Sequence, residues 1–224
     1  MAKFSRIDVL SGMLETGMIP VFYNKDIDIN KQVVKACYDG GVRVFEFTNR
    51  GDFAHQVFEK LVKYAEEELP ELILGTGSVV DAPTAAIYIQ NASNFIVSPV
   101  LNKDMAKVCN RRKIAWIPGC GSLSEISYAE ELGAEIVKIF PADQLGGPQF
   151  VKSIKAPCPW TSIMPAGGVD TSEKNLKNWF SAGVSCVGIG SKLITKEIID
   201  NKNYEILTST VKKTMELIKK LKQK

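Results

Sequence analysis

The sequence predicts an α/β fold, a single (β/α)8 barrel of the TIM type with an additional N-terminal helix. Three observations favour it. Short β-branched or aromatic runs occur eight times along the 224 residues, and a stretch with helical character lies between each consecutive pair. Each repeating unit is roughly 20 to 30 residues long, which suits a strand and a crossover helix. Strict alternation requires parallel strands, and eight units favour a closed barrel over an open sheet.

The eight expected strands are recognised by their β-branched and aromatic residues. They are IPVF from Ile19, VRVFEFT from Val42, LILGTGSV from Leu72, NFIVSPV from Asn94, IAWIPGC from Ile114, IVKIFPA from Ile136, SIMPAGGV from Ser162 and CVGIGS from Cys186. One strand ends in Gly75 to Gly77, but the third glycine of a dinucleotide loop is missing, which disfavours an open nucleotide-binding sheet.

Helices are expected between these strands, as in Phe53 to Glu68 with its helical spacing of apolar residues. A helix near Phe4 to Thr16 should cover the barrel bottom, and Asn203 to Lys222 should form a last amphipathic helix. Asp81 is expected to cap one helix, and Ser122 with Glu125 has the form of a capping box. Helix ends in left-handed residues are predicted at Gly40, Gly133 and Gly183.

The composition indicates one compact domain spanning residues 1–224, because 45% of the residues are hydrophobic and 24% are charged. The net charge of +3 reflects lysines gathered at the C-terminal end, so no nucleic-acid partner is expected. No signal segment and no apolar run long enough for a membrane span are recognised, and we expect a cytoplasmic protein with no membrane partner. The five scattered cysteines favour free buried thiols.

Polar residues within apolar strands indicate which side chains face the barrel interior, because alternate residues of a strand point to opposite faces. In IVKIF, Val137 and Ile139 should face the helices, so Lys138 should point inward together with Phe140. In VRVFEFT, Glu46 and Thr48 should point inward, and Arg50 follows with the same parity past the strand end. We therefore expect a polar group of side chains inside the barrel.

These residue types suit carbonyl chemistry. A buried lysine loses its charge more readily, and a neutral amine attacks carbonyl carbons, so Lys138 is a candidate Schiff-base nucleophile. Such chemistry needs a general acid/base, for which Glu46 is the only acidic residue predicted to face inward from the strands. Arg50 at the barrel mouth could hold the carboxylate of a keto acid. A structural Lys138–Glu46 pair and a solvated Arg50 remain the alternatives.

Two glycine-rich turns follow the last two strands, where barrel enzymes often bind phosphate. Gly167 and Gly168 lie in PAGGV, and Gly190 and Ser191 lie in GIGS. Free backbone N–H groups and helix dipoles can bind an anion at such turns. Tight turns required by the fold alone would also explain the glycines.

The motifs GGVRVFEFTNR, GTGSV, SPVLN, IPGCGSLSE, VKIFPAD, MPAGGV and GIGSKL occur in this order between about Ile7 and Lys192. With them the chain resembles the 2-keto-3-deoxy-6-phosphogluconate (KDPG) and 2-keto-4-hydroxyglutarate (KHG) aldolases, the class I aldolases of the Entner–Doudoroff pathway and of uronate degradation. The resemblance implies a homotrimer without a cofactor or metal. The chain has a single histidine, His55, on a predicted helix. The sequence therefore offers no cluster of metal ligands, in agreement with a metal-free enzyme.

The resemblance also implies roles for individual residues. Lys138 corresponds to the Schiff-base lysine, Glu46 to the general acid/base and Arg50 to the binder of the pyruvate carboxylate, while Ser78 stands where a threonine contacts the keto acid. The implied pocket and phosphate residues are Pro99, Phe140, Gly167, Gly168, Gly190 and Ser191. Three positions depart from the family pattern: Ala166 for a threonine, Val100 for a glycine and Asn49 for an apolar residue.

The leading hypothesis is retro-aldol cleavage of a keto-deoxy sugar acid to pyruvate and an aldehyde such as glyceraldehyde 3-phosphate. A gluconate-derived, galactonate-derived or unphosphorylated substrate is possible. One alternative is another phosphate-binding barrel, such as a sugar-phosphate isomerase, which would partly tolerate Lys138→Arg. The other is a noncatalytic barrel that binds small anions.

Overall fold

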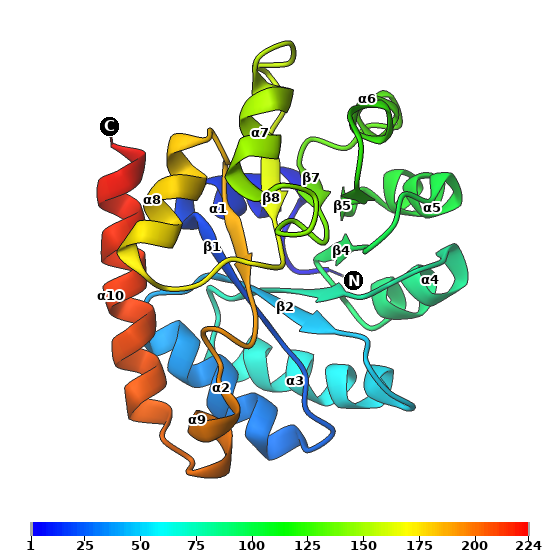
Figure 1. Cartoon of the computed structure of the whole chain (residues 1–224). Coiled ribbons are helices and arrows are strands. Elements are labelled where there is room, and N and C mark those ends of the chain that lie inside the picture. The colour runs from blue at the N-terminus through cyan, green and yellow to red at the C-terminus, as the bar shows by residue number, and fades with distance from the viewer. Residues whose placement is uncertain (1, 224) are drawn as a thin grey trace.

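The computed structural model describes residues 2–223, and its strands form a curled parallel sheet (Figure 1). The strands are β1 (Met18–Phe22), β2 (Val44–Thr48), β3 (Ile73–Gly77), β4 (Phe95–Val97), β5 (Ala115–Ile117), β6 (Gly119–Cys120), β7 (Val137–Ile139), β8 (Ile163–Pro165) and β9 (Val187–Ile189). β5 and β6 belong to one expected strand, which is interrupted at Pro118 because proline has no N–H to donate. The Pro118 carbonyl still accepts from the Lys138 amide at 2.8 Å.

The sheet closes into a barrel. Six strands pair in the order β5-β4-β3-β2-β1-β9, and β6, β7 and β8 pair in a second group. The groups are joined by the chain through Pro118 and by a parallel bridge between Ala166 and Gly188. Close by, the Ser185 amide donates to the Ile163 carbonyl at 2.9 Å. The (β/α)8 fold predicted from the alternating pattern is confirmed.

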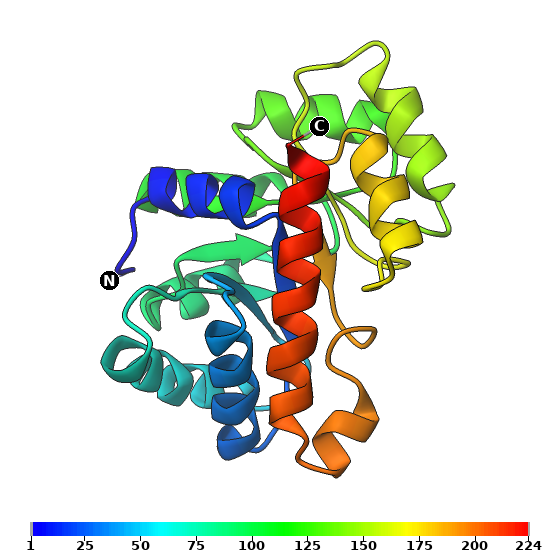
Figure 2. The ribbon, with the colours of Figure 1, turned by 90° about the vertical axis from the view of Figure 1, so that its left-hand side faces the viewer.

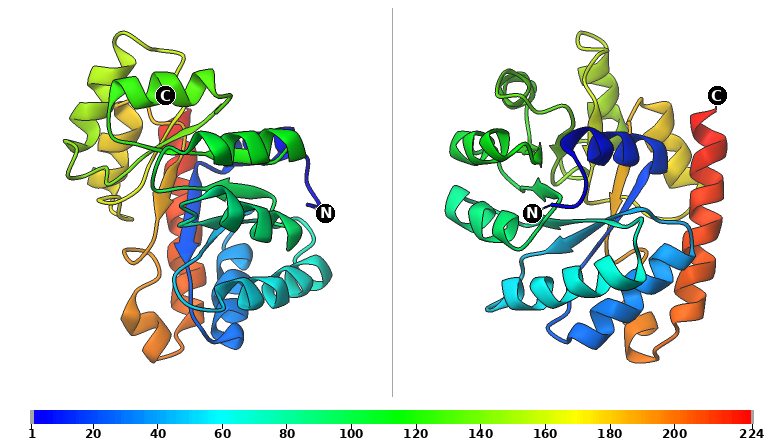
Figure 3. Two further views of the ribbon diagram at one scale, coloured as in Figure 1. Left: turned by 90° about the vertical axis from the view of Figure 1, so that its right-hand side faces the viewer. Right: turned by 180° about the vertical axis from the view of Figure 1, so that it is seen from behind.

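Helices surround the barrel (Figures 1 and 2). Their bounds are α1 (Arg6–Thr16), α2 (Ile27–Asp39), α3 (Ala54–Glu68), α4 (Ala82–Gln90), α5 (Lys103–Arg112), α6 (Leu123–Glu131), α7 (Gly147–Lys155), α8 (Glu173–Ser181), α9 (Lys196–Asp200) and α10 (Tyr204–Lys222). The last helix, α10, packs along α2 and α8. The first, α1, crosses the strands at the barrel bottom, as the view from behind in Figure 3 shows.

Two apolar clusters show to which side of the sheet each strand side chain points. The outer cluster, between strands and helices, contains Phe45, Phe47, Val137 and Ile139. The inner cluster fills the lower barrel with strand residues such as Val44 and Ile136, and Val9 and Met13 of α1 pack against them. The predicted parity of β2 and β7 and the predicted cover by the N-terminal helix are therefore confirmed.

The helix ends agree with most of the expected signals. The Asp81 side chain accepts from the Thr84 amide at 2.8 Å, as an N-cap should. The Ser122 hydroxyl accepts from the Glu125 amide, while the Glu125 carboxylate reaches the Gly121 amide rather than that of Ser122. The carboxylate therefore satisfies the amide one residue before the cap.

Of the three glycines predicted to be left-handed, two are and one is not. Gly133 and Gly183 have positive φ values of 89° and 94°. Gly40 has a φ of −75°, and Gly41 takes the left-handed conformation at 105°. Gly40 is a glycine for another reason: a Cβ there would lie 2.5 Å from Cγ1 of Val211, so only glycine lets α10 approach α2 this closely.

Among the described residues, no helix is both long and apolar enough to cross a membrane. All five cysteines are free thiols; Cys158 is half-buried and the other four are buried. Burial raises the pKa of the Cys109, Cys120 and Cys186 thiols to about 12. They are therefore unreactive core residues, as expected. The predicted single domain 1–224 extends by one residue at each end beyond the described residues.

Candidate active site

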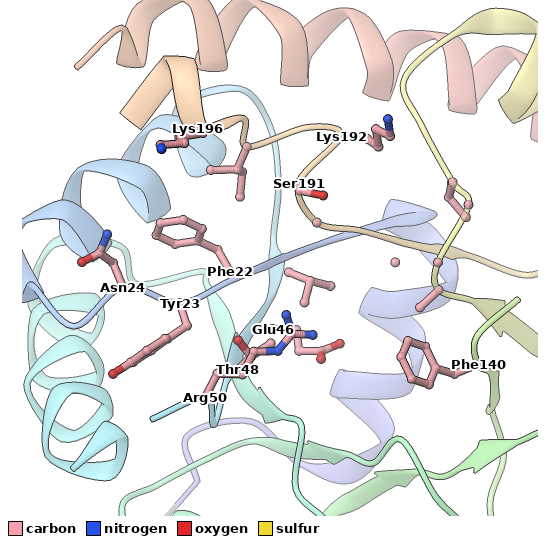
Figure 4. Close-up of a pocket in the computed structure, with 18 of the residues that line it drawn as sticks. Phe22, Tyr23, Asn24, Glu46, Thr48, Arg50, Phe140, Ser191, Lys192 and Lys196 are labelled. Carbon is pink, nitrogen blue, oxygen red and sulfur yellow. The ribbon is translucent and has the colours of Figure 1, made fainter. Parts of the chain in front are cut away.

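A cavity of about 620 Å³ opens at the carboxyl ends of the strands (Figure 4). In parallel barrels this is the end at which ligands bind. The cavity contains Lys138, Glu46, Arg50, Phe140, Gly167, Gly168, Gly190 and Ser191, all of which were predicted site residues. Two other predicted residues, Ser78 and Pro99, are not part of this lining. The fold therefore brings most of the predicted site into one place.

Lys138 and Glu46 face each other across the barrel. They lie on β7 and β2, which are on opposite sides of the strand order, and their long side chains meet inside. The Nζ atom of Lys138 is 4.0 Å from Oε1 of Glu46 and 5.0 Å from the centre of the Phe140 ring. Lys138 is 5% exposed and Glu46 is 1% exposed. The pair is thus held away from bulk water but open to the cavity.

The Glu46 carboxylate has no hydrogen-bond partner among the described residues. Burial raises its pKa above the ordinary value, and the positive charges of Lys138 and Arg50 act in the opposite direction. A carboxyl group whose pKa is raised keeps its proton to a higher pH than an ordinary carboxyl group, which suits a general acid/base. The two unpaired oxygens are free to bind a ligand.

Gly77 makes room for this carboxylate and was not recognised as a site residue from the sequence. A Cβ on Gly77 would lie 1.7 Å from Oε1 of Glu46 and 2.4 Å from its Cδ. Gly77 is paired with Thr48 on the neighbouring strand β2, directly beside the inward-facing residues. The glycines of GTGSV were weighed as a nucleotide loop and as part of a family motif, but neither was given a role in the site, whereas Gly77 is needed for the close approach of a side chain.

Arg50 is exposed at the mouth of the cavity. Its Nε donates to the Ser78 hydroxyl at 3.3 Å, which leaves the two terminal nitrogens of the guanidinium free for a ligand. Ser78 adopts a left-handed conformation with φ of 57°. Ser78 is therefore placed to orient Arg50 rather than to line the cavity.

Pro99 supports the strand next to Lys138. A Cβ on Gly119 would lie 2.3 Å from the backbone carbonyl carbon and oxygen of Pro99, and Gly119 is the register partner of Lys138. Only a glycine allows this backbone contact. The contact of Pro99 with the site is therefore indirect, through the strand that carries Gly119.

The two glycine-rich turns present free amides. Gly167 and Gly168 have positive φ values of 87° and 84°, and within residues 2–223 their N–H groups and that of Ser191 donate to no protein atom. The following helices begin only at Glu173 and Lys196. The turns themselves, and not helix ends, therefore supply the N–H groups that can bind an anion.

Several cavity residues were missed by the sequence reasoning. Phe22, Tyr23 and Asn24 enter the cavity from the end of β1, and Lys192 and Lys196 enter from the segment after β9 (Figure 4). Neither lysine forms an ion pair among the described residues. Their position just after a strand end was the available signal, because every βα loop of a barrel can reach the site.

The three departures from the family pattern differ in their distance from the cavity. Ala166 lines it. Val100 is 45% exposed and Asn49 points outward, where its Oδ1 accepts from the Tyr88 hydroxyl at 2.7 Å. Of the three, Ala166 is therefore the one that can alter what the cavity accepts.

No group of three or more potential metal ligands occurs in the described part of the chain. The chemistry available in the cavity is that of an amine, a carboxyl group and a cation at the entrance. A weakly hydrated amine that faces an unpaired carboxylate inside a parallel barrel is suited to covalent attack on a carbonyl carbon. Fold and site together define a class I, Schiff-base type of barrel lyase.

The family is shown by sequence. A family model described as KDPG and KHG aldolase matches residues 9–210, and the chain belongs to this family. A 2-dehydro-3-deoxy-phosphogluconate aldolase from Pseudoalteromonas atlantica is 31% identical over 95% of both chains. The KHG/KDPG aldolase of Escherichia coli K12 is 29% identical and covers 91% of this chain and 93% of its own.

A solved structure agrees with the fold and with the chemistry. The KDPG aldolase of Legionella pneumophila, with pyruvate captured as a covalent carbinolamine, superposes with a TM-score of 0.79 at 26% identity. The match covers 90% of this chain and 96% of that one. The predicted family and the additional N-terminal helix on an eight-stranded barrel are confirmed.

Proposed function

We propose that the chain cleaves KDPG, or a related 2-keto-4-hydroxy acid such as KHG or the galactonate epimer, to pyruvate and an aldehyde. For KDPG the aldehyde is glyceraldehyde 3-phosphate, as in the Entner–Doudoroff pathway. The observation that carries the proposal is the Lys138 amine 4.0 Å from the Glu46 carboxylate, which has no hydrogen-bond partner among the described residues, in a chain that the KDPG and KHG aldolase family model matches. Arg50 at the mouth supplies a cation for the keto acid's carboxylate.

The proposed reaction begins when the neutral amine of Lys138 attacks the C2 carbonyl carbon and forms a carbinolamine. Glu46, protonated, gives its proton to the C2 hydroxyl, which leaves as water, and the iminium forms. The Glu46 carboxylate then takes the proton of the C4 hydroxyl. The C3–C4 bond breaks, its electrons move into the iminium to give an enamine, and the aldehyde leaves.

The second half returns the enzyme to its starting state. Glu46 delivers the proton it took from the C4 hydroxyl to C3 of the enamine, which gives the iminium of pyruvate. Water adds to C2, one of its protons passes to the Glu46 carboxylate and the other to the amine nitrogen, the C–N bond breaks, and pyruvate leaves with the amine of Lys138 and the protonated Glu46 restored. Glu46 both gives and takes protons in this sequence, which its burial and raised pKa support.

The distal end of the substrate is proposed to bind at the two glycine-rich turns. The amides of Gly167, Gly168 and Ser191 donate to no described protein atom there, and Gly190 lines the cavity beside them. Lys192 adds a positive charge to the same side of the cavity. A phosphorylated tail is the ligand that this combination favours.

The proposal is tested by reductive trapping. With pyruvate and borohydride, the iminium should be reduced to a stable secondary amine, and peptide mass spectrometry should find the pyruvate-derived mass on Lys138. Lys138→Arg and Lys138→Met should carry none and should release no pyruvate from KDPG. A Lys138 peptide that stays unmodified at saturating pyruvate would refute the mechanism, and partial activity of Lys138→Arg would favour the isomerase-type alternative.

We also propose a cytoplasmic homotrimer. Free buried thiols suit a reducing compartment. Exposed apolar residues near the carboxyl ends of the strands, Val80, Ile87 and Val100, are from 45% to 50% exposed and could pack against a neighbouring subunit. Light scattering coupled to gel filtration tests the assembly, for which a mass of one or two chains would contradict the proposal.

A further inference from the structure

Thr48 lies on the inner face of β2 between Glu46 and Arg50 and has no role in the steps above. It lines the cavity and is 2% exposed. Figure 4 shows Glu46, Thr48 and Arg50 gathered on one side of the cavity, with Phe140 on the other. No described residue forms a hydrogen bond with the Thr48 side chain.

Other buried hydroxyl groups of the barrel do have partners. The Thr76 hydroxyl, on the outer face of β3, accepts from Ser93 at 3.1 Å, and the Ser98 hydroxyl accepts from the Val100 amide at 3.1 Å. The Thr48 hydroxyl is not among the fully buried polar atoms that lack a partner, so it opens to the cavity. A valine would fill the same space without offering a hydrogen-bond donor. The hydroxyl of Thr48 is therefore available to a ligand in the cavity.

The depth of Thr48 indicates which part of a ligand it meets. A carbonyl carbon bonded to Nζ of Lys138 lies at the level of Glu46, because Nζ is 4.0 Å from Oε1. The next inward side chain toward the mouth, about 6.6 Å along the strand, is Thr48. Arg50 follows past the strand end, where its amide donates to the Thr48 carbonyl at 2.9 Å. The carboxylate of a 2-keto acid is directly bonded to the carbonyl carbon, and when it extends toward Arg50 it runs along the face of β2 that carries Thr48.

We propose that Thr48 is a specificity-determining residue whose hydroxyl donates a hydrogen bond to the carboxylate of the bound 2-keto acid. Arg50 binds the same carboxylate through its two free terminal nitrogens, and each carboxylate oxygen has a further lone pair for a second donor. Thr48 thus favours 2-keto acids over other carbonyl compounds. This inference rests on the proposed Schiff-base function of Lys138.

The test compares two carbonyl compounds in the borohydride trapping reaction, pyruvate and acetone, which lacks the carboxylate. In Thr48→Val the pyruvate concentration for half-maximal trapping at Lys138 should rise about tenfold or more, as expected for a lost hydrogen bond to a charged group. The acetone concentration should change less than about twofold, because acetone offers no carboxylate to Thr48. Thr48→Ser, which keeps the hydroxyl, should restore the wild-type value for pyruvate.

Thr76→Val is the matched control, because it removes a buried threonine hydroxyl from the adjacent strand outside the cavity. It should lower the melting temperature and leave both trapping curves unchanged. If Thr48→Val does not fold, Thr48→Ala removes the same hydroxyl and carries the same prediction. An equal shift for pyruvate and acetone would assign Thr48 a structural role and overturn the inference, as would no shift for either. If pyruvate were not trapped on Lys138 of the wild type, the proposed Schiff-base function would fail, and the inference on Thr48 would fail with it.

Discussion

Replacing Gly77 with alanine should disable Glu46 without touching it. The new Cβ would lie 1.7 Å from Oε1, 2.4 Å from Cδ and 2.7 Å from Cγ of Glu46. Real Cβ contacts stay above about 3.0 Å, so the carboxylate must move by more than about 1 Å. Because β3 occupies the space on one side, the carboxylate must rotate within the cavity. The present distance of 4.0 Å between its Oε1 atom and Nζ of Lys138 would then change.

A displacement of this size has two expected consequences. A misplacement of about 1 Å at a catalytic group can lower the rate about 100-fold, and general acid/base catalysis contributes about 10²- to 10⁴-fold in all. We therefore expect kcat for pyruvate release from KDPG to fall about 100-fold. Overpacking should also destabilise the protein by about 1 to 3 kcal/mol.

The assay couples pyruvate release to lactate dehydrogenase, and urea unfolding measures the stability. Glu46→Ala added to Gly77→Ala should recover the lost stability, because the clash is gone, but no activity. Gly75→Ala is the matched control: its Cβ would meet the Phe95 ring at 2.4 Å, so it is overpacked on the same strand without touching Glu46. The reasoning would be refuted if Gly77→Ala kept the wild-type kcat. It would also be refuted if Gly75→Ala, at the same stability as Gly77→Ala, showed an equal fall in kcat.

Three further predictions concern charge and hydrogen bonds. Burial raises the pKa of Glu46 above its ordinary value of 4.5, so the folded state keeps a proton that the unfolded state loses first. The wild type should therefore lose stability relative to Glu46→Gln as the pH rises above about 4.5; urea unfolding at several pH values checks this, and parallel curves would contradict it. Tyr88→Phe should cost about 1 kcal/mol in urea unfolding, because Asn49 loses its donor, and should leave kcat/KM unchanged; a changed preference among keto acids would instead place Asn49 in the site. Lys192→Ala should raise KM about two- to fivefold for phosphorylated substrate only, and the effect should shrink at high salt; equal effects on an unphosphorylated keto acid would exclude a role in binding the tail.

The fold could be predicted from the sequence because it shows two regular patterns, one along the chain and one within single strands. Apolar runs of strand length alternate with helical spacing eight times, and within β2 and β7 the parity of single residues separates Phe45 and Val137, which face the helices, from Glu46 and Lys138. Such parity is a property of the backbone and needs no knowledge of neighbours. The left-handed conformation predicted for Gly40 was wrong. A glycine is needed there because Val211, a residue far away in the sequence, packs against it.

The site was predictable to the extent that its residues stand at strand ends. Lys138, Glu46 and Arg50 could be found by parity, whereas Gly77 could not, since its importance is the space that a side chain of another strand occupies. Tyr23 and Lys192 were missed because loop residues have no period that fixes their direction. The glycine-rich turns lead toward helices, as expected, but α8 begins only at Glu173, so the free amides belong to the turns and the sequence could not separate their contribution from that of a helix dipole.

The inner face of β2 combines three polar side chains of increasing exposure. Glu46 is 1% exposed, Thr48 is 2% exposed and Arg50 is exposed at the mouth. The Glu46 carboxylate has no hydrogen-bond partner among the described residues, and buried polar groups without partners destabilise a fold. A small barrel core could easily have been filled with valine or leucine at both positions. Their retention beside Lys138 is understandable if a bound 2-keto acid supplies the missing partners: its carboxylate for Thr48 and Arg50, and its reacting hydroxyl group for Glu46. A 2-keto acid that binds the folded chain alone should therefore also raise its stability against unfolding.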